Sequence, residues 1–173
     1  MKKFLAIIIL GLLWCNVVLA NDLRVVDGDT IDLNGEKIRF SGIDAPESYY
    51  RGKEQTCLIN EAIIHCGKLS KEFLIKKIGT NKVTCKREKE PDQYKRILAE
   101  CFVNGESLSK ILVKNGYAFD YARYSKKKYA QDQEYAKKAI KEIMVSISKS
   151  EHYMFSVPLE VNVNSGYNWG DTH

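Results

Sequence analysis

Residues 23–44 read L-R-V-V-D-G-D-T-I-D-L-N-G-E-K-I-R-F-S-G-I-D and carry the strongest structural signal in the chain. Short apolar runs alternate with turn signals, and Asn34-Gly35 between two alternating runs is a strong sign of a two-residue hairpin. Ile38 and Phe40 share one face of the last run, whereas Arg39 belongs to the other. We therefore predict short strands at about 23–26, 30–33 and 37–41, joined by tight turns.

The pattern beyond residue 44 adds helices to these strands. Residues 67–78 read G-K-L-S-K-E-F-L-I-K-K-I and place Leu69, Phe73, Leu74 and Ile78 on one helical face. Two more strands are expected at about 82–86 and 96–103, and helices at 107–115 and 127–147. Short strands followed by amphipathic helices predict an α+β fold, with a small closed barrel as its architecture.

The N-terminus has the three parts of a secretory signal. A basic M-K-K start is followed by the apolar run F-L-A-I-I-I-L-G-L-L-W and by a Val18-Leu19-Ala20 end. We predict a signal peptide over residues 1–20 that is cleaved after Ala20, with an uncleaved anchor helix as the alternative. Residues 21–150 then form one domain, and residues 151–173 a C-terminal tail with an edge strand at most, because Pro158 interrupts its alternation.

The composition excludes several classes of protein. The chain has 173 residues, a net charge of +5 and 45% hydrophobic residues, which is too apolar and too weakly charged for a disordered chain. Five cysteines are too few for a miniprotein held by disulfides alone. Beyond the N-terminus, no apolar run reaches the roughly 20 residues of a membrane span. One globular domain remains.

The cysteines predict two disulfides. Removal of residues 1–20 takes away Cys15 and leaves four cysteines, an even number in an exported chain. Four cysteines allow three pairings, and spacing alone does not choose among them. Cys57 and Cys66 are neighbours around a short loop, and Cys85 and Cys101 would lie within disulfide reach as antiparallel partners. We favour these two pairs.

Three fragments bring charged side chains to strand ends and loops: V-V-D-G-D-T at 25–30, I-R-F-S-G-I-D-A-P-E at 38–47 and D-Q-Y-K-R at 92–96. Each alone fits an ordinary reading, namely an Asp-Gly turn, a solvated strand with an acidic loop, and a charged hairpin tip. Together they supply carboxylates and guanidiniums: Asp27, Asp29, Asp44, Glu47, Arg39 and Arg96. Carboxylates suit a hard cation such as Ca²⁺, and guanidiniums suit phosphate oxygens. The combination predicts metal-assisted phosphodiester hydrolysis.

The sequence resembles the staphylococcal nuclease (thermonuclease) family over roughly residues 23–142. The motifs that carry the resemblance are V-D-G-D-T, R-F-S-G-I-D-A-P-E, Y-K-R and L-V-K-N-G-Y-A, in this order. The resemblance implies a five-stranded Greek-key β-barrel of oligonucleotide-binding type with three α-helices, which agrees with the pattern of strands and helices.

The resemblance also implies roles for single residues. Asp29 and Asp44 would bind Ca²⁺ through their side chains, and Ala45, where the family often has Thr, through its backbone carbonyl. Asp27 matches an acidic position near the metal. The remaining positions are the general base, the two phosphate-binding arginines and two nucleotide-holding aromatics: Glu47, Arg39, Arg96, Tyr94 and Tyr124.

The implied activity is a calcium-dependent nuclease. It would hydrolyse DNA and/or RNA on the 5′-oxygen side and leave 3′-phosphates, as a monomer exported to the periplasm or secreted, without stable membrane association after signal cleavage. Nine basic against five acidic side chains in residues 105–142 could follow a nucleic-acid backbone, or could be a solvated helix face. The alternatives are a non-catalytic nucleic-acid-binding barrel and, if the signal is not cleaved, an envelope-associated structural domain.

Overall fold

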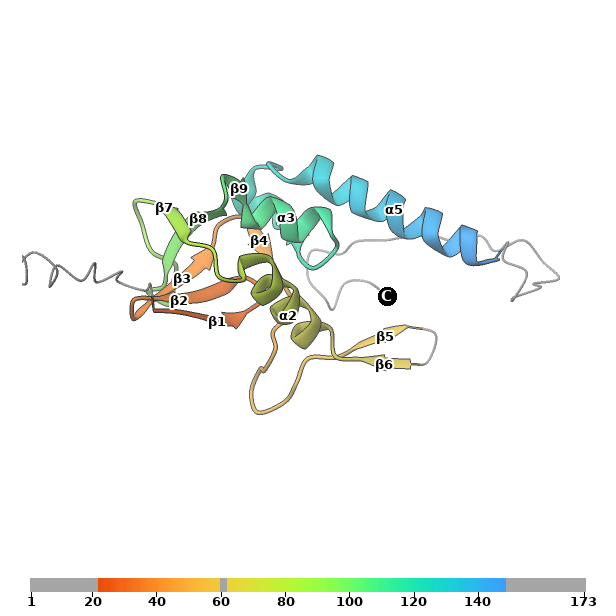
Figure 1. The fold of residues 1–173 in the computed structure, drawn as a ribbon, viewed down its shortest axis with the longest axis horizontal. Helices are drawn as coiled ribbons and strands as arrows, with labels where there is room; N and C mark the ends of the chain where they lie inside the picture. Colours follow the sequence, from red (N-terminus) through yellow and green to blue (C-terminus); the bar gives the residue numbers. More distant parts are fainter. Residues whose placement is uncertain (1–21, 60–61, 149–173) are drawn as a thin grey trace, which may run out of the picture.

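The computed structural model describes residues 22–59 and 62–148 (Figure 1). The signal peptide expected over residues 1–20 and the tail over 151–173 lie outside the described residues. Within the described ranges, no helix is both long and apolar enough to cross a membrane.

The centre of the fold is a mixed sheet whose main path has the order β1-β2-β3-β8-β7. Its strands are β1 (Leu23–Asp27), β2 (Thr30–Leu33), β3 (Glu36–Phe40), β8 (Ile97–Val103) and β7 (Val83–Arg87), with β9 (Glu106–Ser107) paired to β8. All pairs are antiparallel except β3 with β8, which is parallel. The predicted α+β class with a five-stranded barrel of oligonucleotide-binding type is confirmed.

The hairpin between β2 and β3 forms where the sequence predicts it. Asn34 and Gly35 have φ values of 55° and 82°, the left-handed conformation that both central residues of a type I′ turn require. On β3, Ile38 and Phe40 are buried on one face, so Arg39 between them is directed to the other. This alternation separates the hydrophobic core from the charged side of the sheet.

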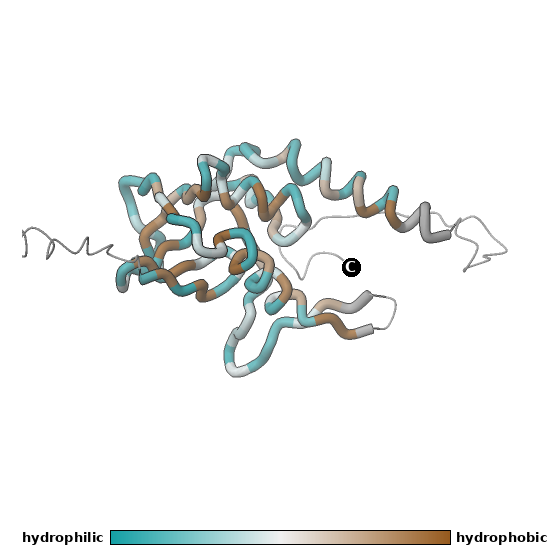
Figure 2. Tube along the Cα trace, in the orientation of Figure 1, coloured by the Kyte–Doolittle hydropathy of each residue, from teal (hydrophilic) through white to brown (hydrophobic). Residues whose placement is uncertain are grey.

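Helices cover the sheet. They are α2 (Cys66–Ile78), α3 (Leu108–Lys114), the single turn α4 (Ala122–Ser125) and α5 (Ala130–Ser148). Helix α2 packs on β1 and α3, and α5 packs on α3 (Figure 1). The fully buried core joins residues from strands and helices: Ile31, Ile38, Phe40, Leu74, Leu108 and Leu112. In Figure 2 hydrophobic residues, coloured brown, recur along the strands of the sheet and along the helices.

The structure differs from the sequence prediction in one helical face and one loop. Leu69 was expected on the same face of α2 as Leu74 and Ile78, but it is 45% exposed whereas those two are buried. The segment expected as a loop between Cys57 and Cys66 forms a hairpin, β5 (Cys57–Ile59) with β6 (Ala62–Ile64), that projects beside α2 (Figure 1).

Both disulfides favoured by the sequence are formed in the structure. Cys85 and Cys101 are direct partners in the antiparallel β7–β8 register, and Cys101 is completely buried. Cys57 and Cys66 join the start of β5 to the first residue of α2. The Cys85–Cys101 disulfide therefore joins two neighbouring strands of the sheet, and the Cys57–Cys66 disulfide closes the segment that leads into α2.

Candidate active site

Arg39 lies at the centre of the acidic cluster. Its Nη1 donates to Oδ1 of Asp29 at 2.7 Å, and its Nη2 donates to Oδ1 of Asp44 at 2.6 Å. The β2–β3 register brings this about, because Arg39 pairs with Thr30, the residue after Asp29. Asp44 is reached because β4 (Ile43–Asp44) directly follows the turn at the end of β3. One guanidinium thus bridges acidic residues from two of the three sequence fragments.

Asp29 is the most deeply placed of these acids, with 1% of its surface exposed. Its Oδ1 accepts a hydrogen bond from Thr30 Oγ1 at 2.9 Å, and its Oδ2 accepts the Ala45 N–H at 3.0 Å. Burial raises the pKa of Asp29, and the charge of Arg39 opposes the rise. The arginine therefore balances a carboxylate that water does not reach.

Glu47 lies beside the same cluster. Burial raises the pKa of Glu47 to about 7, and the charges of Asp29 and Asp27 add to the rise. Asp27 is itself held by Ser48, which donates its N–H at 2.9 Å and its hydroxyl to Oδ1. A glutamate that titrates near neutral pH can exchange protons with water under ordinary conditions.

The donor set fits a hard divalent cation. Asp29 and Asp44 bond to Arg39, Glu47 interacts with its charge, and Asp27 interacts with Glu47, so these four carboxylates outnumber the one guanidinium among them. Each carboxylate oxygen can accept more than one partner, so Oδ2 of Asp29 keeps acceptor capacity besides its bond from the Ala45 N–H. In residues 22–59 and 62–148, no three His, Cys, Asp or Glu side chains are already arranged to hold a metal ion. The expected set, two aspartates and one backbone carbonyl, does not need such a group.

Arg96 and Tyr94 form a second group, at the entrance to β8. Asp92 accepts the backbone N–H groups of Tyr94 and Arg96 and the Nε–H of Arg96, at 2.9, 2.8 and 2.7 Å. The Arg96 guanidinium lies 5.3 Å from the centre of the Tyr94 ring. Arg39 pairs with Leu98 in the parallel β3–β8 register, and Arg96 lies two residues before Leu98, just outside β8, which is the spacing of side chains on one face of a strand.

Tyr124 lies on a different element, α4, which packs against β4. The ring of Tyr121 is 4.8 Å from its ring, and the Tyr121 N–H donates to the carbonyl of Gly42 at 3.0 Å. This bond docks α4 against the turn that leads from β3 to β4. Tyr94 and Tyr124 are 70% and 64% exposed, so both rings are accessible to a ligand.

Sequence reasoning missed three residues that hold the site. Ser48 anchors Asp27, Gln55 accepts the Glu47 N–H through Oε1 at 2.7 Å, and Asp92 fixes Arg96. The signal for Asp92 was present, since an aspartate before a tight turn commonly accepts backbone N–H groups two residues on. The contacts of Ser48 and Gln55 leave no comparable pattern in the sequence.

Comparisons with known proteins find a matching family model and several relatives. A family model described as "Staphylococcal nuclease homologue" matches residues 37–145, a stretch that begins after Asp29. The chain is 33% identical over 115 residues to the succinoglycan biosynthesis protein ExoI of Rhizobium meliloti (strain 1021), covering 65% of this chain and 58% of that protein. It is 38% identical over 106 residues to endonuclease YhcR of Bacillus subtilis (strain 168), covering 57% of this chain and 8% of YhcR. Endonuclease YncB of the same organism is 31% identical over 108 residues, 55% of this chain and 44% of YncB. The chain thus spans less than two thirds of each of these relatives.

Proposed function

The chain belongs to the staphylococcal nuclease family, and from this premise we propose that it is an exported, calcium-dependent nuclease. Its substrates are DNA and/or RNA, and it cleaves phosphodiesters on the 5′-oxygen side. The endonuclease names of two relatives, YhcR and YncB, support the reaction class. The observation that carries the proposal is the guanidinium of Arg39 held between Asp29 and Asp44, with Glu47 beside them.

Glu47 is the general base in this proposal. Its pKa of about 7 lets it take a proton from water near neutral pH. The resulting hydroxide attacks phosphorus and the bond from phosphorus to the 5′-oxygen breaks. The 5′-oxygen leaves with the bonding electron pair and takes a proton from water, so that a 3′-phosphate and a 5′-hydroxyl remain. The resemblance of the A-P-E motif and the position of Glu47 in the acidic cluster support this role.

Arg39 and Arg96 bind the phosphate oxygens and stabilise the charge that develops in the transition state. Asp29, Asp44 and the carbonyl of Ala45 would hold Ca²⁺. When bound, Ca²⁺ supplies a Lewis acid that offsets the charge on the phosphoryl group. Because Asp29 and Asp44 position Arg39 as well, the same two acids serve metal binding and phosphate binding.

Tyr94 and Tyr124 hold the nucleotide by stacking. Their exposure and the cations beside them support this role, since Arg96 and Arg123 lie 5.3 and 5.8 Å from the two ring centres. These contacts would also serve a barrel that binds nucleic acid without cutting it, the alternative function. A module of that kind needs no base near neutral pKa, so Glu47 favours the enzyme.

The remaining parts of the proposal concern the whole chain. Residues 1–20 act as a signal peptide, residues 21–150 as the nuclease domain and 151–173 as a tail, and the mature protein is a monomer in the periplasm or outside the cell. The two disulfides support an oxidising compartment. In this proposal the mature protein has no stable association with the membrane once residues 1–20 are removed.

The test is a cleavage assay of the mature chain on single-stranded DNA and on RNA, with Ca²⁺ or with a chelator. We expect cleavage in Ca²⁺, loss of cleavage in chelator, and products whose 3′ ends accept a label only after phosphatase treatment. Binding to either nucleic acid without cleavage in Ca²⁺ would establish the alternative function and refute the nuclease.

A further inference from the structure

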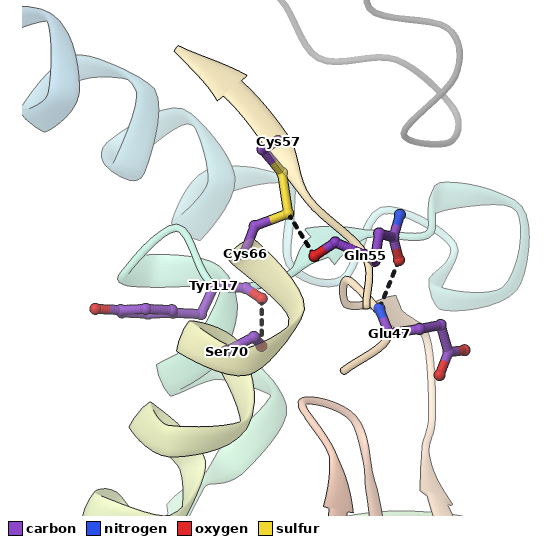
Figure 3. Close-up of a disulfide and its surroundings, with 6 residues drawn as sticks. All are labelled: Glu47, Gln55, Cys57, Cys66, Ser70 and Tyr117. Carbon is purple, nitrogen blue, oxygen red and sulfur yellow. Dashed lines mark hydrogen bonds between the residues drawn. A yellow bond between two sulfur atoms is a disulfide. The ribbon is translucent and has the colours of Figure 1, made fainter. Parts of the chain in front are cut away.

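The segment between Glu47 and α2 makes a direct contact with the backbone of Glu47. Oε1 of Gln55 accepts the Glu47 N–H at 2.7 Å (Figure 3). The carbonyl oxygen of the same glutamine lies 3.7 Å from Sγ of Cys66 and accepts the Gly67 N–H at 3.4 Å. Gln55 is thus fixed at its backbone by the start of α2 and reaches Glu47 through its side chain.

The disulfide Cys57–Cys66 closes this arrangement. Cys57 follows Gln55 by two residues, and Cys66 is the first residue of α2. The rest of the segment offers little burial, because Tyr49 and Tyr50 are more than half exposed and the Tyr50–Lys53 bridge is local. The covalent bond therefore restrains Gln55 where hydrophobic packing does not.

Helix α2 itself is a firm support for the Glu47 backbone. A Cβ at Gly67 would lie 1.9 Å from the Glu47 carbonyl oxygen, so helix and loop touch with no side chain between them. One turn on, Ser70 Oγ donates to the carbonyl of Tyr117 at 2.8 Å, which ties the same end of α2 to the segment after α3 (Figure 3). Helix α2 is thus a fixed support against which the positions of Gln55 and the Glu47 backbone are set.

We propose that Gln55 is a positioning residue for Glu47, and that the Cys57–Cys66 disulfide holds Gln55 in place against the first turn of α2. The inference rests on the proposed function in one respect, the role of Glu47 as the base. Displacement of a reacting group by about 1 Å can lower a rate by about 100-fold. The hydrogen bond from the Glu47 N–H to Gln55 therefore affects the rate, through the position of Glu47, more than it affects the stability of the fold.

The first experiment compares Gln55→Met with Gln55→Glu in the mature chain. Methionine keeps the length of the side chain but lacks the acceptor oxygen, whereas glutamate keeps an acceptor. We expect kcat of Gln55→Met to fall about 10- to 100-fold with KM changed less than about twofold, and Gln55→Glu to recover most of the loss. Amide hydrogen exchange at Glu47, measured by NMR, should accelerate in Gln55→Met only.

The outcomes separate this inference from the proposed function. Wild-type protein that cuts nothing in Ca²⁺ refutes the proposed function, and the positioning role falls with it. Active wild-type protein with unchanged kcat in Gln55→Met refutes the positioning role alone, whatever happens to the exchange of the Glu47 amide. A fall in kcat with unchanged Glu47 exchange also refutes it, because the rate would then depend on another contact.

The second experiment tests the link to the disulfide with a double-mutant cycle. The pair Cys57→Ser/Cys66→Ser should lower kcat as Gln55→Met does, and combining the two should cause no further loss, because both act through one contact. Cys85→Ser/Cys101→Ser is the matched control and should lower the unfolding temperature while kcat, measured well below that temperature, stays unchanged. Full additivity of the Cys57/Cys66 and Gln55 effects would refute the link.

Reduction of the wild-type protein should reproduce the fall in kcat expected for Cys57→Ser/Cys66→Ser. A dithiol such as dithiothreitol breaks the Cys57–Cys66 bond, leaves a thiol on each cysteine and is itself oxidised to a cyclic disulfide. We expect kcat to fall about as far as in Cys57→Ser/Cys66→Ser, and to return on reoxidation. Unchanged kcat after full reduction of this bond, confirmed by thiol labelling, would refute the role of the disulfide.

Discussion

Arg39 donates from Nη1 to Oδ1 of Asp29 across 2.7 Å, and it is the charge that balances this buried carboxylate. The pair connects the stability of the fold with the proposed reaction. Asp29 is the proposed metal ligand and Arg39 the proposed phosphate-binding residue, and each fixes the position of the other in the absence of substrate. Asp44, bonded to Nη2 of the same guanidinium, extends the pair to a third group.

Arg39→Gln should therefore lose stability as well as activity. Removing one partner of a buried ion pair leaves an uncompensated charge, which typically lowers the free energy of unfolding by about 3–5 kcal/mol. Arg96→Gln is the control, because Arg96 is partly exposed and its loss should lower stability by about 1 kcal/mol or less. Urea denaturation of both variants measures the difference, and equal stabilities would contradict the structural role of Arg39.

Glu47→Gln should be more stable than the parent at pH 8 in chelator. Burial and the charges of Asp29 and Asp27 raise the pKa of Glu47 from its ordinary value of 4.5 to about 7, so ionisation opposes folding increasingly between these pH values and by a constant amount above them. The advantage of the variant, about 2 kcal/mol at pH 8 after a reduction for solvent screening of this half-buried carboxyl, should shrink as the pH falls from 7 toward 4.5 and vanish below it, where the carboxyl is protonated in both states. Denaturation curves across this range provide the measurement, with exposed Glu90→Gln expected to show no such trend.

Asp92→Asn should weaken catalysis by releasing Arg96. Desolvation opposes ionisation of Asp92, but the N–H and guanidinium of Arg96 lower its pKa below the ordinary value. The stability this carboxylate provides is present above pH 4 and is lost as the pH falls through the lowered pKa. We expect kcat/KM at pH 7 to drop about tenfold and wild type and variant to reach equal stability only in strong acid. A variant with wild-type kcat/KM would remove Asp92 from the site.

Ca²⁺ should raise the unfolding temperature of the protein. A ligand that binds only the folded state at 100 times its dissociation constant adds about 2.7 kcal/mol of stability. Asp44→Asn should abolish the shift, whereas Asp32→Asn, which removes a carboxylate paired with exposed Arg24, should keep it. Thermal scans with Ca²⁺ and with chelator distinguish the two variants, and a persistent shift in Asp44→Asn would exclude Asp44 as a ligand.

Tyr94→Ala and Tyr124→Ala should raise KM with little effect on stability. Both rings are mostly exposed, so truncation removes little buried surface, but each stacked base contributes about 1–3 kcal/mol of binding. Tyr135→Ala is a matched control, since this tyrosine on α5 is 57% exposed and has Lys114 Nζ 4.9 Å from its ring centre. An equal rise in KM for all three variants would contradict a specific role of Tyr94 and Tyr124 in holding the nucleotide.

The parts of the fold that the sequence predicts are those with a local cause. Asn34-Gly35 specifies its own turn, and alternation along residues 37–41 assigns Ile38 and Phe40 to the core. The exposure of Leu69 could not be predicted in this way, because the width of the buried stripe on α2 depends on its neighbours. The β5–β6 hairpin was missed for a similar reason, since its short apolar runs are compatible with loop or strand.

The candidate site likewise has residues that the sequence predicts and residues that it does not. Its acids and Arg39 lie within residues 27–47 and are visible as motifs, Arg96 is visible in the charged fragment at 92–96, and the resemblance adds the roles of the two tyrosines. Gln55 was invisible, because a bond from a side-chain amide to a backbone N–H can be made by many residues and leaves no spacing rule. Supporting contacts of this kind need the three-dimensional structure.

The parallel pairing of β3 with β8 makes the complete site depend on a contact between distant parts of the chain. Parallel strands need a long crossover, and the segment that carries Arg96 comes beside β3 through the β3–β8 pairing, with α2 and β7 between the two strands in the chain. A chain that is still extended, as during passage through a membrane, carries every reactive group and no active site. Under the proposed function, the exported chain is therefore inactive while it is unfolded and cleaves nucleic acid only after it has folded.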